Sequence, residues 1–328
     1  MPESRWRADD PNPRGGVRGA RGVSAHDDRF VLTGHDDILV LDTSWHLLGR
    51  FSHPILSSVH DVIADERGIW ATCVRGDSLA LMSWDGELLD WWSIGADRRL
   101  ARKLDIHLVR PFDPQADYRD PRIDLAGWST VNLNGLGRGS AGLLLCLGRI
   151  AERRPHRRFP FRRRPLRPAS FAIAELPDDG PVREASASVV LHRRDHAVEA
   201  PNHNAGEDGD LLVYNDSNRN VLVLWDRRAG AEVRAIPIPG DPPFARGLTR
   251  VGPGKWLVGS QRPLAVHAVD LERGEVVRSY ELGGGENESV YAITPLPDRF
   301  DEPRPPRSGG PYEFWARAAG SGVTPIPM

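Results

Sequence analysis

The 328-residue sequence has only two cysteines and no apolar run of the length that crosses a membrane. Cys73 and Cys146 each lie within an apolar, strand-like run, where a free thiol packs as a small hydrophobic side chain, so no disulfide framework is expected. Residues 1–16 are polar and rich in proline and glycine, unlike a secretory signal. We therefore expect a soluble, cytoplasmic protein that does not bind membranes, and we also expect it to be a monomer.

The sequence also has no large excess of basic or acidic residues, because 43 basic and 45 acidic residues leave a net charge of −2. Attraction of the whole molecule to nucleic acid is therefore excluded, and any such binding must be local. The residues that are abundant are 33 glycines and 28 prolines, which separate short apolar runs of four to seven residues. No long segment has the 3.6-residue period of a helix, so the pattern predicts an all-β chain.

A repeat underlies these short runs. Each unit has a strand, a tight turn, a second strand that often carries tryptophan, a third strand ending near aspartate, and a fourth strand. Units begin near His60, Asn134, His203 and Arg246, and His203 and Arg246 are 43 residues apart. A period of about 40–45 residues is typical of the four-stranded blade of a β-propeller. A β-sandwich is the alternative, but it has no such regular spacing.

The blade count depends on how the ring closes. We expect a disordered tail over 1–16, a single propeller over 17–298 with insertions at 96–128 and 149–168, and a proline-rich segment over 299–328. Six blades of four antiparallel strands are favoured, with residues 311–318 (PYEFWARA) completing the sixth. In the five-bladed alternative, Val290–Pro295 joins the N-terminal strands. Either route leaves only short, protected strand edges.

Six short motifs carry a resemblance to a known family. In chain order they are His60-Asp61, Leu133-Asn134-Gly135-Leu136, Pro201-Asn202-His203, Asn215-Asp216-Ser217, Ala245-Arg246-Gly247-Leu248 and Val290-Tyr291-Ala292. Over roughly residues 50–297 the chain resembles a bacterial family of WD40-like propellers of unknown function. Asn132 stands where this resemblance leads us to expect a histidine. More distantly, the chain is similar to gluconolactonase-type and strictosidine-synthase-like six-bladed propellers, and this similarity implies a divalent cation held by carboxylate and asparagine ligands.

The first strand of every blade lines the central channel, so residues at its start should gather at one mouth of the ring. Aligning the repeats predicts catalytic roles for His60, Asp61, His203 and Arg246. The predicted substrate-binding residues are Asn132, Asn134, Asn204, Tyr291 and, from the 96–128 insertion acting as a lid, His107. A wet, polar channel mouth without a function would have the same residue types, and remains the alternative.

Two chemistries fit these residues. In the first, His60, His203 and Glu288 hold one divalent metal ion, which could be Zn, Mn, Fe or Ca. In the second, a histidine acts as general acid or base without a metal, and Arg246 binds a substrate carboxylate or phosphate. Arg246 could instead be an ion-pair partner of Glu288. No nucleotide-cofactor motif is present.

Two functions remain open at this point. The first is an enzyme of the hydrolase, lyase or isomerase type that acts on a small, anionic substrate at the channel mouth. The second is a non-catalytic scaffold that binds a protein or nucleic acid through its outer face. Residues 153–167 carry eight arginines, for which a solvated loop is the favoured interpretation and a binding site for an acidic partner of the scaffold is the alternative. The polar column at the channel mouth favours the enzyme, because a scaffold does not need it.

Overall fold

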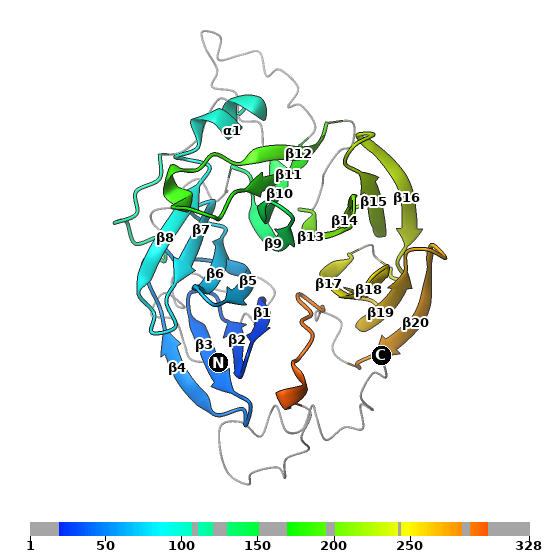
Figure 1. Cartoon of the computed structure of the whole chain (residues 1–328), viewed down its shortest axis with the longest axis horizontal. Helices are drawn as coiled ribbons and strands as arrows, with labels where there is room; N and C mark the ends of the chain where they lie inside the picture. Colours follow the sequence, from blue (N-terminus) through cyan, green and yellow to red (C-terminus); the bar gives the residue numbers. More distant parts are fainter. Residues whose placement is uncertain are drawn as a thin grey trace, which may run out of the picture.

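The computed structural model describes residues 20–106, 111–120, 130–150, 169–194, 201–241, 244–283 and 289–300. It contains five four-stranded antiparallel sheets arranged around a centre as the blades of a propeller (Figure 1). In each sheet the strands are paired in chain order, and the first strand is the innermost. The predicted all-β propeller is therefore confirmed.

The strands of the first three blades follow the predicted repeat. Blade 1 consists of β1 (Val23–His26), β2 (Arg29–Thr33), β3 (Ile38–Asp42) and β4 (Leu47–Phe51). Blade 2 consists of β5 (Val59–Asp65), β6 (Gly68–Cys73), β7 (Ser78–Met82) and β8 (Leu88–Ser93). Blade 3 consists of β9 (Leu133–Gly139), β10 (Gly142–Ile150), β11 (Ser170–Leu176) and β12 (Ser188–Arg193), with the 3-10 turn η1 (Val182–Glu184) before β12.

The last two blades begin at the predicted 43-residue interval. Blade 4 consists of β13 (His203–Asp208), β14 (Leu211–Asp216), β15 (Val221–Asp226) and β16 (Ala231–Pro237). Blade 5 consists of β17 (Arg246–Gly252), β18 (Lys255–Gly259), β19 (Ala265–Asp270) and β20 (Glu275–Glu281), and a 3-10 turn, η2 (Asp298–Phe300), ends the described chain.

The core is divided among the junctions between neighbouring blades. Four separate clusters of buried apolar side chains lie between blades 1 and 2, 2 and 3, 3 and 4, and 4 and 5. The sequence of strand β10 is almost continuously apolar because its alternate side chains belong to two clusters. Leu143 and Leu145 belong to one cluster, and Leu144 belongs to the next. Alternate side chains of a strand point to opposite faces, and here both faces are buried.

The junction between blades 5 and 1 is built differently. Residues 289–300 lie between these two blades (Figure 1), and Val290 N–H donates to Ser260 O (3.2 Å) of blade 5. At the other end, the Phe300 ring packs against Phe30 and Trp45 of blade 1. The favoured sixth blade is absent from the part of the chain that the structure describes, which agrees with the five-bladed alternative; residues 311–318 lie outside that part.

The predicted strand at Val290–Pro295 is absent, because this segment pairs with no neighbouring strand. Pro295 and Pro297 have no N–H to donate to a ladder, which explains why the apolar run does not extend a sheet. The sequence also gave no sign of α1 (Arg98–Lys103), which follows blade 2. Its N-cap is Asp97, whose Oδ1 accepts the N–H of Leu100 (3.0 Å).

Aspartates at strand ends shape the tight turns. The side chains of Asp65, Asp226 and Asp270 each accept backbone N–H groups two and three residues further along the chain. This local hydrogen bonding is the reason why aspartate recurs where a strand turns back. The aspartate periodicity of the sequence therefore marks turns rather than ligands.

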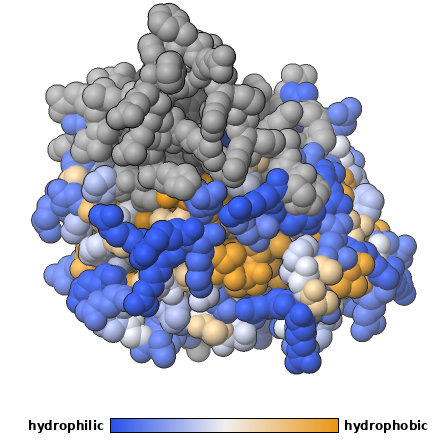
Figure 2. All heavy atoms as spheres, turned by 90° about the horizontal axis from the view of Figure 1, so that it is seen from above, coloured by the Kyte–Doolittle hydropathy of each residue, from blue (hydrophilic) through white to orange (hydrophobic). Residues whose placement is uncertain are grey.

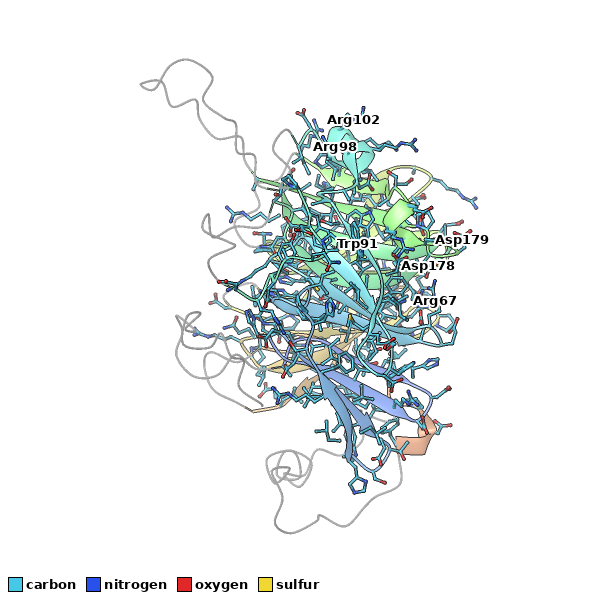
Figure 3. All side chains as sticks on the ribbon, turned by 90° about the vertical axis from the view of Figure 1, so that its left-hand side faces the viewer. Arg67, Trp91, Arg98, Arg102, Asp178 and Asp179 are labelled. Atoms are coloured by element: carbon cyan, nitrogen blue, oxygen red, sulfur yellow. The ribbon has the colours of Figure 1, made fainter. Side chains whose placement is uncertain are left out.

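The long connections all leave from one face of the ring. The two predicted insertions follow β8 and β10, and the other gaps in the described chain before Phe300 follow β12, β16 and β20. In an antiparallel blade these connections begin at the face where the inner strand starts. The opposite face has tight turns and carries Arg67 and Asp178, which form an ion pair there (Figure 3). On the side of the ring that carries α1 and β12, the coloured residues are mostly hydrophilic, with apolar residues near the middle and toward the right of the view (Figure 2).

Close approach of the inner strands requires glycine at position 137. A Cβ atom there would overlap the backbone oxygen of Ala205 in β13. We therefore expect Gly137→Ala to lower the free energy of unfolding by about 1–3 kcal/mol, because the two inner strands must move apart. Urea unfolding followed by tryptophan fluorescence measures this change. The control is Gly49→Ala in β4, where a Cβ would meet no atom within 4 Å; equal stability of the two variants would contradict the prediction.

Candidate functional site

Irregular pairing at the start of the inner strands places the predicted site residues. In blades 2 to 5 the register between the first and second strands shifts near this point. His60 and Asp61 lie in the shift of β5, Asn134 in that of β9, Asn204 in that of β13 and Gly247 in that of β17. Such bulges redirect side chains and are common next to active sites. The predicted column is therefore a repeated structural feature of the inner strands.

Two of these residues have left-handed backbone conformations. The φ angle is 51° at Asn204 and 64° at Gly247, the residue types that adopt this region most readily. The Asn204 amide bonds to residues of blades 2 and 5. Its Nδ2 donates to Asp61 Oδ2 (3.0 Å), and its Oδ1 accepts the N–H of Gly247 (3.0 Å).

Asp61 is the centre of this network. Its Oδ2 also accepts the N–H of Leu136 in β9 (3.0 Å), and its Oδ1 accepts the N–H of Val62 (3.0 Å). Burial raises the pKa of Asp61 to about 7, although these hydrogen bonds oppose the rise. Asp61 and Asn204 thus join the inner strands of blades 2 to 5. The structure gives both residues an architectural role, and their predicted catalytic and substrate-binding roles stay predictions.

The other predicted catalytic residues form a second group, which contains aromatic rings. The Arg246 guanidinium lies 3.7 Å from the ring centroid of Phe244 and 4.2 Å from that of Tyr291. The Tyr291 ring meets the His60 ring edge-on at 6.4 Å, and the Phe244 ring meets the His203 ring in the same way at 5.9 Å. We call His60, His203, Arg246, Phe244 and Tyr291 the histidine–arginine cluster.

Both histidines of this cluster are held neutral. Burial lowers the pKa of each imidazole well below its usual value, and the guanidiniums of Arg21 and Arg246 lower both values further. His203 is 3% exposed and Arg246 is 7% exposed. His203 Nδ1 lies 3.2 Å from Ser217 Oγ. Within the described residues, His60 Nδ1 and His203 Nε2 are buried and have no hydrogen-bond partner.

The remaining predicted residues are distributed around this cluster. Asn134 is 2% exposed, and neither atom of its amide has a hydrogen-bond partner among the described residues. It lies at the junction of blades 3 and 4, where a Cβ on Gly148 would come within 2.6 Å of its Oδ1. Asn132 precedes it with a φ angle of 52°. His107 and Glu288 lie outside the described residues.

The metal prediction can be tested only in part. Among the residues that the structure places, no three His, Cys, Asp or Glu side chains are grouped so that they could hold a metal ion. The charged groups next to His60 and His203 are the cations Arg21 and Arg246 rather than carboxylates, which does not fit a cation site. Glu288, the predicted third ligand, lies outside the described residues, so the metal site stays a prediction.

Four residues near the site were not predicted. Phe244, Ser217, Arg21 and His35 contact or electrostatically influence the histidine–arginine cluster. His35 is partly buried and lies near His60. Ser217 and Phe244 stand within or beside two of the short motifs, and this position was the only signal available in the sequence.

Comparisons with known proteins show the fold and nothing finer. No family profile and no curated protein matches the sequence. Among solved structures, a streptogramin B lyase is similar with a TM-score of 0.50 and 14% identity, over 82% of this chain and 71% of the lyase. A protein of unknown function from Bacteroides caccae has a TM-score of 0.50 and 11% identity, over 84% and 85% of the two chains.

A further similar structure is the WD40 β-propeller domain of Doa1, with a TM-score of 0.48, 10% identity, and coverage of 83% of this chain and 71% of that domain. The similarity to the two structures with a TM-score of 0.50 shows the overall fold alone, and the five sheets agree with the coarser part of the expected resemblance, the propeller fold. It assigns no activity. No helix among the described residues is long and apolar enough to span a membrane.

Proposed function

We propose that this propeller binds a small anionic substrate at the histidine–arginine cluster and acts on it by acid–base chemistry, as a hydrolase, lyase or isomerase. The observation that carries the proposal is the pair of neutral imidazoles, each with a buried ring nitrogen that has no partner in the described part of the chain, beside the Arg246 guanidinium. A buried nitrogen acceptor left without a donor is unfavourable for folding alone, and a ligand could satisfy it.

The charges favour an anion as the ligand. Arg246 and Arg21 both act on His60 and His203, so the cluster has a positive electrostatic environment. The faces of the Arg246 guanidinium lie against Phe244 and Tyr291, which orients its N–H edge. Carboxylate and phosphate groups bind guanidinium through that edge.

Because of the positive charges of Arg21 and Arg246, the basicity of the His203 imidazole would depend on whether the anionic substrate is bound. In the free protein burial, and after it the guanidiniums of Arg246 and Arg21, keep the pKa of His203 low, so its imidazole is neutral and weakly basic. A bound anion would offset this positive charge and raise the pKa of the imidazole. His203 would then accept a proton from the substrate or from a water molecule more readily when the substrate is present. His60 is the second candidate for this proton transfer.

Titration calorimetry tests this proposal. The probes are inorganic phosphate, sulfate, acetate, malonate and glycerol phosphate, each titrated at pH 6 in two buffers that differ in ionisation enthalpy. We expect at least one probe to bind with uptake of a fraction of a proton, and we expect at least a tenfold weaker affinity in Arg246→Met, because a charge-assisted contact is lost.

The matched control is Arg228→Met, since the Arg228 side chain is 81% exposed in a surface ion pair with Asp210. This variant should bind as the wild type does. The proposal would be overturned if no probe binds. It would also be overturned if every probe that binds has the same affinity for Arg246→Met and for the wild type.

A further inference from the structure

We propose that Ser217 is the positioning residue of His203: it fixes the proton on Nδ1 and leaves Nε2 as the acceptor. This inference rests on the proposed function, because it names the residue that prepares the base for proton transfer. Ser217 would act through His203 and would not contact the substrate itself.

The hydrogen bonds of Ser217 determine the tautomer. Its hydroxyl donates to the backbone oxygen of Ala245 (2.8 Å), and its Oγ also lies 3.2 Å from His203 Nδ1. A serine hydroxyl has one proton, and a carbonyl oxygen can only accept. The Ser217 proton therefore points to Ala245, so Oγ must accept a hydrogen bond from the imidazole. This arrangement requires a proton on Nδ1 of His203.

The reverse arrangement fits the structure less well. If Ser217 donated to His203 Nδ1, the shorter contact to Ala245 O would join two acceptors without a proton between them. The neutral imidazole would then carry its proton on Nε2, which is buried and has no acceptor among the described residues. A buried N–H without an acceptor is unfavourable. In the Nδ1–H tautomer both contacts of Ser217 Oγ have a proton, and Nε2 is a buried acceptor that a ligand can satisfy.

Ser217 is itself held in place from three directions. It is 1% exposed, and its backbone N–H donates to Asn202 Oδ1 (3.0 Å), in the residue before His203. Ala245, its hydroxyl partner, is the residue before Arg246. The serine thus links the base to the main chain that carries the cationic residue. Such fixation by a partner at the other ring nitrogen is how histidine tautomers are set in catalytic and metal sites.

The contact also explains one of the sequence motifs. Asn215 of β14 pairs directly with His203, and Ser217 is the first residue after this strand. The Asn215 side chain donates through Nδ2 to Gly247 O (3.2 Å). The Asn-Asp-Ser element therefore bridges the Asn-His and Ala-Arg-Gly elements, although the three are far apart in the sequence.

The experiment is long-range ¹H–¹⁵N correlation NMR of the histidine side chains in the ¹⁵N-labelled full chain at pH 7.5. The spectrum distinguishes a protonated from an unprotonated ring nitrogen. For the wild type we expect His203 to be neutral with the proton on Nδ1. A wild-type spectrum with the proton on Nε2 would overturn the inference directly, and this measurement needs no variant to fold.

Variants then test whether Ser217 is the cause. In Ser217→Ala we expect the Nε2–H tautomer of His203 to become the major form, and Ser217→Thr, which keeps the hydroxyl, should restore Nδ1–H. An unchanged His203 spectrum in Ser217→Ala would overturn the role of Ser217. The matched control is Ser279→Ala, because Ser279 Oγ lies 2.8 Å from Nδ1 of a different histidine, His267; it should leave the His203 signals unchanged.

The two proposals fail in different ways. If the anions do not bind but the tautomer follows Ser217, only the proposed function is overturned. If anions bind with proton uptake through Arg246 while His203 keeps its tautomer in Ser217→Ala, only the role of Ser217 is overturned.

Discussion

Replacing Asp61 by alanine is expected to lower the free energy of unfolding by about 3 kcal/mol or more. The change removes the acceptor for the N–H groups of Leu136 and Val62 and for the Asn204 amide, and all three donors are in the interior. Each buried donor left without a partner costs about 1–3 kcal/mol, while removal of a buried carboxylate offsets part of this loss. Urea unfolding with circular dichroism measures the change.

Two further variants make this test specific. Asp61→Asn keeps an acceptor oxygen for the cross-blade bonds, so its loss should be well below that of alanine. Asp210→Ala removes an aspartate that is 65% exposed at a turn and should change stability by less than about 0.5 kcal/mol. If Asp61→Ala were as stable as Asp210→Ala, the network through Asp61 would have no architectural role.

Acid should destabilise the protein through His60 and His203. The folded-state pKa of each is lowered well below 6.5, whereas the unfolded chain binds protons at these positions below about pH 6.5. Their contribution to stability is therefore complete above pH 6.5 and is lost as the pH falls toward the folded-state values. While both imidazoles stay unprotonated in the folded state, the slope of this loss approaches about 1.4 kcal/mol per pH unit for each histidine.

The measurement is the free energy of unfolding against pH for the wild type and for the double variant His60→Gln, His203→Gln. The difference between the two curves removes the contribution of Asp61, which has the opposite sign because its raised pKa makes stability fall from about pH 4 to pH 7. His26→Gln, at the β1–β2 turn, controls for the loss of any histidine and should retain the wild-type acid slope. Parallel curves for wild type and double variant would show that the two imidazoles are not held neutral by folding.

The sequence predicted the fold well because blade formation is local. The strand runs, the aspartate turns and the 43-residue interval between His203 and Arg246 are properties of neighbouring residues, and they reappear in the structure almost without change. Ring closure was not predictable in the same way. It depends on how Val290 and Phe300 contact blades that are distant in the sequence.

The sequence could predict which residues lie together but not the contacts that each of them makes. The starts of the inner strands could be aligned from the repeat, so His60, His203 and Arg246 were expected to lie near one another. The sequence could not indicate that Asp61 would be surrounded by backbone N–H donors from two strands, because register shifts decide which N–H groups turn inward. Ser217 and Phe244 were missed for the same reason, since they act across strands or blades.

The placement of all long connections on one face of the ring has a consequence for how this protein can diversify. The opposite face is tied together by short turns, in which a changed length would disturb strand pairing. On the face where the inner strands start, insertions and deletions leave the ladders and the junction cores untouched. Selection can therefore alter what enters the channel mouth by exchanging connections, while the ring keeps the same packing.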